Sequence, residues 1–273
     1  MKQRRVLYYT ISAIVYLGVI IGGYSLYNVL KPNNEKVEED HSEHTTNPLT
    51  EKDDHSNHAA SPESEVTTTV NYENNILTIM LKDKNQKAPT LELNHEKRMH
   101  LIVVSSDLME YYHVHPTDKG AGVFEQNLSL KDNSYKAFVD IKPKGLNYEV
   151  KPNEIHVGEK HSAHGENQLV VDKEFTKTVN NKQVELKIDS LVSKQPTTLS
   201  FDIKNGTPEP YLGALGHVVI LDKAAENFIH VHPASDKETI FKTQFETPGI
   251  YKIWAEFKFE NEVHVYPYIV EVK

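Results

Sequence analysis

The chain has 273 residues, a formal net charge of −9 at pH 7 and no cysteine. The acidic balance argues against nucleic acid as a partner, because phosphate backbones are bound by basic surfaces. The lack of cysteine excludes disulfides, thiolate metal sites and cysteine nucleophiles, and it is compatible with an oxidising location. Any metal site must therefore be built from nitrogen and oxygen ligands, and the chain has 15 histidines to supply the nitrogen.

The first 30 residues are predicted to anchor the chain in a membrane. Residues 6–30 carry no charge, and a helix of this length can cross a bilayer, which needs about 20 residues, whereas the core of a signal peptide has about 7 to 15. Lys2, Arg4 and Arg5 precede this run and the mainly acidic residues 35–40 follow it. The positive-inside rule therefore places the bulk of the chain on the extracytoplasmic side. A long cleaved signal peptide is the alternative.

Residues 31–65 are predicted to form a disordered tether, because they are polar and show almost no apolar periodicity. The tether and a second polar segment, residues 153–167, carry three His-Ser-x-His tetrapeptides. Their histidines are His41, His44, His55, His58, His161 and His164. We expect such flexible pairs to collect divalent metals weakly, because a mobile site must be ordered on binding. The alternative is that histidine is merely tolerated in a solvated linker.

From residue 66 onward the pattern predicts short β-strands and no helix. Leu186 and Ile188, for example, alternate with charged residues, which is typical of a strand with one buried face. About seven such strands in roughly 100 residues are typical of an antiparallel sandwich. We therefore predict an all-β fold of two tandem antiparallel β-sandwiches, residues 66–152 and 168–273, joined by the histidine-containing linker.

A histidine pattern occurs twice and indicates two copies of one domain. In the first copy His100 opens an apolar run, and His-Val-His-Pro follows at residues 113–116. In the second copy His217 opens the run, and the same tetrapeptide follows at residues 230–233. The copies are 117 residues apart, and in each copy 13 residues separate the first histidine from the second. Self-similarity of this kind is the signature of a repeated domain.

Each copy is predicted to fold into a hairpin that brings its three histidines together. Alternate residues of a strand share one face, so His230 and His232 point the same way, and the hairpin sets His217 opposite them. His264 lies on a later strand and is predicted to complete the site if that strand lies near the hairpin. Four neutral imidazoles suit copper(II) or zinc.

The first copy supplies the three equivalent ligands, which are His100, His113 and His115. It has no fourth histidine, because Tyr148 stands where His264 stands in the second copy. We therefore predict that this site binds metal more weakly or has an open coordination position. Met99 and Met109 flank it, so a mixed site with thioether sulfur is one alternative. The other is that the histidines only hydrogen-bond across a strand pair.

Three further residues are interpreted as structural. His95 and His156 are alternatives for the missing fourth ligand of the first copy, but neither matches a position of the repeated pattern, and lone histidines of this kind are usually satisfied or exposed side chains. Trp254 alternates with the residues that face the core, so we interpret it as a half-buried packing residue. A role in shielding the metal from solvent is the alternative for this side chain.

The segments around the histidines resemble a known family. In the second copy these segments are GHVVIL, FIHVHP, PGIYKIWAEF and VHVYPYIVEV, and in the first copy the segment is MHLIVVSSDLMEYYHVHP. They are similar to the small immunoglobulin-like domains of bacterial extracytoplasmic proteins of the YtkA/FixH-like kind, which are often found near copper or heavy-metal handling genes. The resemblance implies a secreted or anchored immunoglobulin-like β-sandwich concerned with metal. Tyr148 departs from the pattern of the second copy.

The leading interpretation is a membrane-anchored, extracytoplasmic protein that binds copper(II) or zinc and buffers it or exchanges it with a partner protein. It predicts no enzymatic activity. A cupin-like metal-dependent enzyme is one rival, but 15 residues and a complete strand separate Gly249 from His264, whereas the last cupin histidine follows the proline-glycine turn closely. A pair of surface domains that bind a protein, with incidental histidines, is the other rival.

Overall fold

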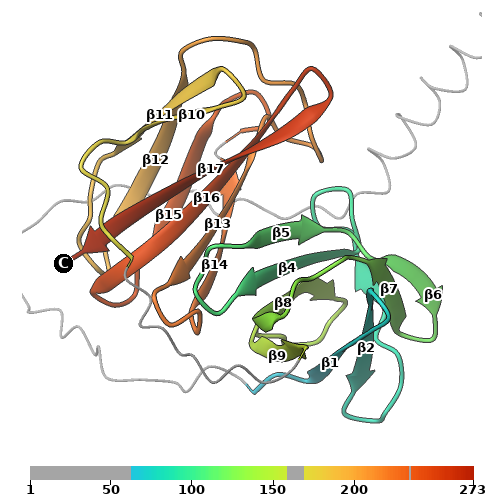
Figure 1. Ribbon diagram of the computed structural model, residues 1–273. Coiled ribbons are helices and arrows are strands. Elements are labelled where there is room, and N and C mark those ends of the chain that lie inside the picture. Colours follow the sequence, from blue (N-terminus) through green and yellow to red (C-terminus); the bar gives the residue numbers. More distant parts are fainter. Residues whose placement is uncertain (1–62, 159–168, 234) are drawn as a thin grey trace, which may run out of the picture. The chain divides into compact units, whose positions relative to one another are not determined.

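The computed structural model describes residues 63–158, 169–233 and 235–273, and every regular element in these ranges is a β-strand (Figure 1). The prediction of an all-β chain with antiparallel sheets is therefore confirmed. No helix within these ranges has the length and hydropathy to span a membrane. The predicted anchor, the tether and most of the predicted linker lie outside the described residues.

The first repeat forms two antiparallel sheets that enclose a core of their own. One sheet has the order β1-β2-β7-β6, with β1 at Val66–Glu73, β2 at Ile76–Asp83, β7 at Val123–Asn127 and β6 at Thr117–Gly120. The other has the order β3-β8-β4-β5, with β3 at Leu91–Glu92, β8 at Asn133–Pro143, β4 at Met99–Ser105 and β5 at Tyr111–Val114. A last strand, β9 at Pro152–Val157, also pairs with β8.

The second repeat forms a continuous path of eight antiparallel strands in the order β10-β11-β12-β15-β14-β13-β16-β17. The path folds over on itself, because residues of β11 and β12 share one core with residues of β16 and β17. The strands are β10 (Thr176–Val179), β11 (Lys182–Ile188), β12 (Pro196–Ile203), β13 (His217–Asp222), β14 (Phe228–Pro233), β15 (Ile240–Gln244), β16 (Gly249–Phe259) and β17 (Glu262–Val272).

The first repeat extends beyond the boundary that the sequence predicts. We expect it to end at Pro152, but this residue is the first of β9, which pairs along β8 as far as the contact between Asn133 and Val157. Ile155 of this strand is 4% exposed and belongs to the core of the first repeat. Glycine, charge and histidine after Pro152 suggested a linker, and the alternation within β9 is too short to distinguish a strand there.

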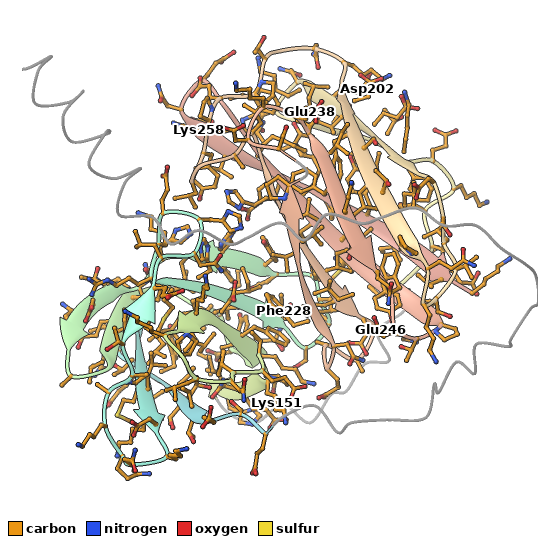
Figure 2. The ribbon with its side chains drawn as sticks, turned by 180° about the vertical axis from the view of Figure 1, so that it is seen from behind. Lys151, Asp202, Phe228, Glu238, Glu246 and Lys258 are labelled. Atoms are coloured by element: carbon orange, nitrogen blue, oxygen red, sulfur yellow. The ribbon has the colours of Figure 1, made fainter. Side chains whose placement is uncertain are left out.

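A third apolar cluster contains residues of both repeats, and we call it the shared cluster. Its buried members are Ile102, Val104, Leu108, Phe138, Leu169, Val219, Leu221, Ala225 and Trp254. Because strand residues alternate between faces, Leu101 on β4 faces the first core and Ile102 faces the shared cluster. On β13, Val218 faces the second core and Val219 the shared cluster. Phe228, labelled in Figure 2, packs against the same cluster. Both central strands are therefore buried on two faces.

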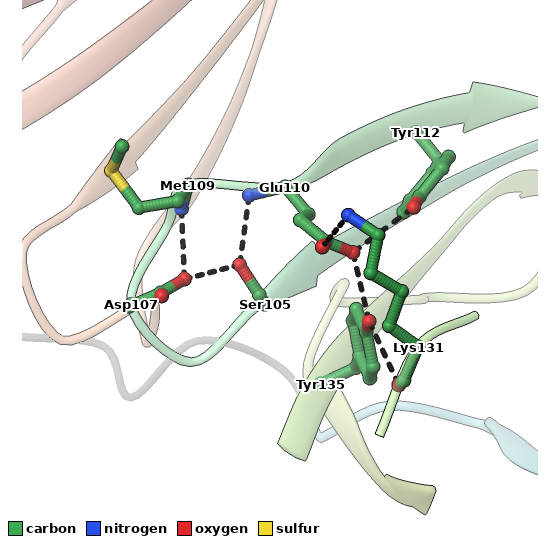
Figure 3. Close-up of polar contacts among 7 residues, drawn as sticks. All are labelled: Ser105, Asp107, Met109, Glu110, Tyr112, Lys131 and Tyr135. Carbon is green, nitrogen blue, oxygen red and sulfur yellow. Dashed lines mark hydrogen bonds and ion pairs between the residues drawn. The ribbon is translucent and has the colours of Figure 1, made fainter. Parts of the chain in front are cut away.

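A hydrogen-bonded turn closes the β4–β5 hairpin at one end (Figure 3). The Asp107 carboxylate accepts the Met109 N–H at 3.0 Å, and the Ser105 hydroxyl accepts the Glu110 N–H at 2.8 Å. The Glu110 carboxylate in turn accepts hydrogen bonds from Lys131, Tyr112 and Tyr135. Lys131 and these hydrogen bonds hold the pKa of Glu110 below its usual value. This network fixes the hairpin register, and therefore which residues meet at the open end.

Candidate metal centre

Three histidines of the first repeat meet at the open end of the β4–β5 hairpin. His113 on β5 is paired with Ile102 on β4, so it shares a face with His100, two residues before Ile102. Nδ1 of His100 lies 2.9 Å from Nε2 of His113 and 3.2 Å from Nε2 of His115. All three ligand atoms lie within 4.8 Å of one another, so this buried to half-buried triad could hold a metal ion.

The outer hydrogen bonds of two rings fix which nitrogens carry lone pairs. Nε2 of His100 donates to the carbonyl oxygen of Asn94 at 2.8 Å, because a carbonyl can only accept. Nδ1 of His113 donates to Oε2 of Glu256 at 2.8 Å. In the neutral rings, Nδ1 of His100 and Nε2 of His113 are therefore both acceptors, and they face each other at 2.9 Å. Two such lone pairs repel unless a cation lies between them.

The distances among the three nitrogens are compatible with a metal ion as well as with hydrogen bonds between the rings. Two nitrogens bound to one ion at about 2.0–2.1 Å lie about 3.3–3.4 Å apart in a tetrahedron and about 2.8–3.0 Å apart in a square plane. The observed separation of 2.9 Å lies in the second interval, and that of 3.2 Å lies just below the first. A proton links two nitrogens only, whereas here a third converges on the same place. Both the tetrahedral geometry of zinc and the square geometry of copper(II) are compatible with these separations.

Burial keeps two imidazoles in the neutral form that metal binding requires. Burial, reinforced by the neighbouring His113 and His100, lowers the pKa of His115 to about 3. Burial likewise lowers the pKa of His217 to about 4, although the hydrogen bond to the Tyr211 carbonyl opposes the shift. Both rings are therefore uncharged at neutral pH and have a lone pair available.

These shifts predict that the metal-free protein loses stability in mild acid. The pKa values of His115 and His217 are lower in the folded chain than the value of about 6.5 in an unfolded one, so the unfolded state binds more protons. Above pH 6.5 both side chains are neutral in the folded and the unfolded chain, so their burial causes no pH-dependent loss. As the pH falls below 6.5 towards the pKa values of the folded chain, the unfolded state takes up protons and the free energy of unfolding decreases. Urea denaturation with chelator at pH 7.5 and pH 5 should show this loss. Between these two pH values, the His115→Gln, His217→Gln variant should lose less free energy of unfolding than the parent. The exposed control His156→Gln should lose as much as the parent.

The second repeat contributes His217 to the same region. It opens β13, is 3% exposed, and its Nε2 donates to the Tyr211 carbonyl at 2.8 Å. Its ring centroid lies 6.3 Å from that of His100 and 6.0 Å from that of His113. One histidine of the second predicted site therefore lies beside the first site.

The backbone of β14 has the register that the repeated pattern predicts. His230 pairs with Val219, as His113 pairs with Ile102 in the first repeat. His232 pairs with Lys242 of β15 on the other side of the strand. The side chains of His230 and His232 lie outside the described part of the structure, so their part in a site stays a prediction.

The structure does not bring His264 to the other histidines. Cross-strand partners share a face, and His217 pairs with Glu256, which pairs with Val265. His264 is the neighbour of Val265 and therefore points to the opposite face, where it contacts the Phe259 ring at 5.4 Å between centroids. The expectation that His264 completes a site with His217 is wrong for this reason.

The two methionines that flank the first site do not join it. Met99 is 1% exposed and belongs to the first core, on the face of β4 opposite to His100. Met109 is 71% exposed and lies in the turn at the closed end of the hairpin, as Figure 3 shows. The mixed histidine and methionine site is therefore not formed. Tyr148, which replaces the fourth histidine, donates to the Val139 carbonyl at 2.6 Å.

Sequence reasoning missed Glu256 and gave His95 only as an alternative ligand of the first site. Glu256 is 3% exposed, and the signal for it is a carboxylate between the apolar residues Ala255 and Phe257 of β16. His95 was interpreted as ordinary, yet its ring lies 5.6 Å from His217 and 6.3 Å from His100. No spacing rule predicts His95, because it stands in a turn with positive φ before β4. His156 is exposed on β9, in agreement with its interpretation.

The strands and the histidine cluster define a tandem all-β protein with a candidate metal centre. The chain belongs to the family described as Domain of unknown function (DUF8832), whose model matches residues 59–158 and 177–273. These two stretches coincide with the two repeats. A comparison with curated proteins found no similar sequence.

Three solved structures are distantly similar to the chain. A two-domain fibronectin type III segment of chicken tenascin is 12% identical, with a TM-score of 0.24, and the match covers 76% of this chain and 98% of that one. The FN1–FN3 domains of chicken CNTN1 are 13% identical, with a TM-score of 0.23, over 77% of this chain and 66% of that one. The BSP domain of a biofilm associated protein is 12% identical, with a TM-score of 0.22, over 77% and 30%. Scores this low do not assign the chain to a fold family.

Proposed function

We propose that this protein binds a divalent transition-metal ion, copper(II) or zinc, through His100, His113 and His115. The proposal rests on the convergence of three ring nitrogens, two of which are held as lone-pair donors by the Asn94 carbonyl and the Glu256 carboxylate. Metal-bound histidines commonly donate their other N–H to a carbonyl or a carboxylate in this way. The same partners fix ring orientation, so little order has to be created when the ion binds.

The site is suited to buffering or exchanging the metal. Three ligands from one hairpin leave at least one further coordination position on the ion, which another residue or an exchangeable ligand can take. His100 is 1% exposed, whereas His115 at the end of the hairpin is only half-buried. A partner protein that gives or accepts the ion would approach from the side of His115.

The proposal includes a location outside the cytoplasm. It is supported by the uncharged residues 6–30, the basic residues before them and the lack of cysteine. Copper and zinc ligands built only from imidazole remain intact in an oxidising compartment, where thiolates form disulfides. The anchor would hold the two repeats near the membrane surface.

Removing two ligands tests the proposal. In the full-length protein, the His113→Ala, His115→Ala variant is expected to bind the first equivalent of copper(II) or zinc at least about 100-fold more weakly. This loss should exceed the about 10- to 100-fold effect of outer partners, because the metal–nitrogen bonds themselves are lost. Competition with a chelator of known affinity measures the change.

The matched control is His41→Ala, His44→Ala, which removes the same number of imidazoles from the predicted tether. Its affinity for the first equivalent should equal that of the parent. If the His113→Ala, His115→Ala variant bound the first equivalent with the affinity of the parent, this centre would be ruled out. An equal loss in the control would also rule it out, because the tightest site would then lie outside the hairpin.

A further inference from the structure

The two repeats contact each other through equivalent residues. Tyr111 stacks on Trp254 with 4.9 Å between ring centroids and 13° between planes. The residues that correspond to them in the other repeat, Phe228 and Phe138, stack on each other at 5.3 Å and 16°. Each stacked pair therefore joins one repeat to the other. The two pairs are equivalent, because each ring of one pair has its counterpart in the other pair, on the opposite repeat.

Two lysines at equivalent positions also contact the opposite repeat. Lys252 on β16 donates to the Leu108 carbonyl at 2.6 Å, and Lys136 at the corresponding position of β8 donates to the Ala224 carbonyl at 2.9 Å. Both carbonyls belong to hairpin turns of the opposite repeat. Lys252 is 6% exposed, and burial lowers its pKa. Contacts that occur in reciprocal pairs indicate one specific docking arrangement, as in a two-fold symmetric interface between identical subunits.

This docking directs His217 towards the triad. The hydrogen bond from its Nε2 to Tyr211 matches the one from His100 to Asn94, six residues earlier in each case, so Nδ1 of His217 carries the lone pair. Rings bound to one ion in a tetrahedron have centroids about 5 Å apart, and those of the triad are separated by 4.8 to 5.2 Å. The His217 ring centroid lies 6.0 and 6.3 Å from those of His113 and His100, and His217 is not among the residues whose ligand atoms lie within 4.8 Å of one another, so its ring must move towards the triad to join the same shell.

The second repeat also contributes the carboxylate that holds His113. Glu256 is the cross-strand partner of His217, so both side chains are on the face that meets the first repeat. Its Oε2 accepts from Nδ1 of His113 at 2.8 Å, and both side chains are almost fully buried, at 4% and 3% exposure. A ligand of the first repeat is thus oriented by an acidic residue of the second.

We propose that the metal centre is shared between the repeats, with His217 as the fourth nitrogen ligand and Glu256 as the positioning residue of His113. This inference rests on the proposed function and adds that tight binding requires the second repeat to be docked. The ligand set is then four neutral imidazoles, three from one repeat and one from the other. Four nitrogens favour copper(II) or zinc over cations that prefer oxygen.

Nitrogen counting tests the role of His217. Full-length protein loaded with half an equivalent of copper(II), so that only the tightest site is filled, should show four coordinated nitrogens by electron paramagnetic resonance. The His217→Ala variant should show three and bind copper(II) at least about 10-fold more weakly. His156→Ala removes an exposed imidazole on β9 and should resemble the parent.

The positioning role of Glu256 has a separate readout. Glu256→Leu removes the acceptor of the His113 N–H and is expected to lower affinity about 10- to 100-fold. Glu256→Gln keeps an acceptor oxygen and should restore part of the loss, whereas a merely structural effect would not depend on the acceptor. Circular dichroism in chelator confirms that each variant is folded.

Three results would overturn the inference. If His217→Ala and Glu256→Leu keep the affinity and nitrogen count of the parent, the centre is confined to the first repeat and the proposed function survives alone. If His217→Ala lowers the number of bound ions by one but leaves the first ion unchanged, His217 belongs to a different site. If the parent protein binds neither copper(II) nor zinc, the proposed function and the inference fail together.

Discussion

Replacing Trp254 with alanine is expected to destabilise the protein by about 3–5 kcal/mol, the usual cost of removing a large buried aromatic side chain. Trp254 is 2% exposed in the shared cluster. Its ring stacks on Tyr111 and lies 5.3 Å from Nζ of Lys252, so the substitution removes a cation–π contact as well as apolar packing. Urea denaturation of the metal-free protein measures the change in the free energy of unfolding.

The effect of Trp254→Ala should differ in kind from that of a substitution inside one repeat. Phe201→Ala removes a ring that is 3% exposed in the second core, and a similar loss of stability is expected. Only Trp254→Ala should also weaken metal binding under conditions where both variants are folded, because it loosens the docking of the repeats. Equal metal affinities, or a loss below about 1 kcal/mol for Trp254→Ala, would show that the shared cluster does not hold the repeats together.

Local periodicity was sufficient to predict the triad. The two-residue period of a strand sets His113 and His115 on one face, and the pairing across a hairpin sets His100 opposite them. Both rules act within 16 residues of one chain segment, and the turn between Ser105 and Glu110 fixes the register. The sequence therefore contains the information for this part of the site, and the all-β fold follows from the same alternation.

The prediction that failed, that His264 joins His217, depends on the pairing of strands that are distant in the chain. The two turn residues Glu260 and Asn261 have positive φ and make a tight hairpin that pairs Phe257 with His264. That register could be predicted from the sequence. The pairing of His217 with Glu256 could not, because β13 and β16 are distant in the chain and their register is set by packing. Without the pairing of His217 with Glu256, the sequence does not show that His264 and His217 point to opposite faces of the sheet.

The docking of the repeats was also beyond sequence reasoning. A one-sided pattern is expected of strands in a separate sandwich, whereas β4 is buried at every position. A continuous apolar run can indicate burial on two faces, but it does not identify what covers the second face. Reciprocal contacts such as that of Tyr111 with Trp254 appear only when both repeats are in place. Glu256 acquires its role as a partner of His113 from the same arrangement.

Gly216 gives a second test of the site, through the backbone. An alanine Cβ at this position would lie 2.5 Å from Cε1 of Phe257 and 2.8 Å from the carbonyl oxygen of Glu256. The carbonyl belongs to β16 and cannot rotate away as a flexible side chain could, so β13 must move away from β16. We expect Gly216→Ala to cost about 1–3 kcal/mol, as overpacking usually does. Because His217 follows directly and pairs with Glu256, metal affinity should fall about 10-fold or more.

Gly145→Ala provides the matched control for this last prediction. Gly145 has φ of +69°, and a Cβ there would meet nothing within 4 Å. Alanine at such a φ costs roughly 1–2 kcal/mol through the backbone alone, so the two variants lose comparable stability for different reasons. Only Gly216→Ala moves the strand that carries His217, and only it should weaken copper(II) or zinc binding in a chelator competition. If both variants bound metal equally, the close approach of β13 to β16 at Gly216 would have no part in positioning the ligands.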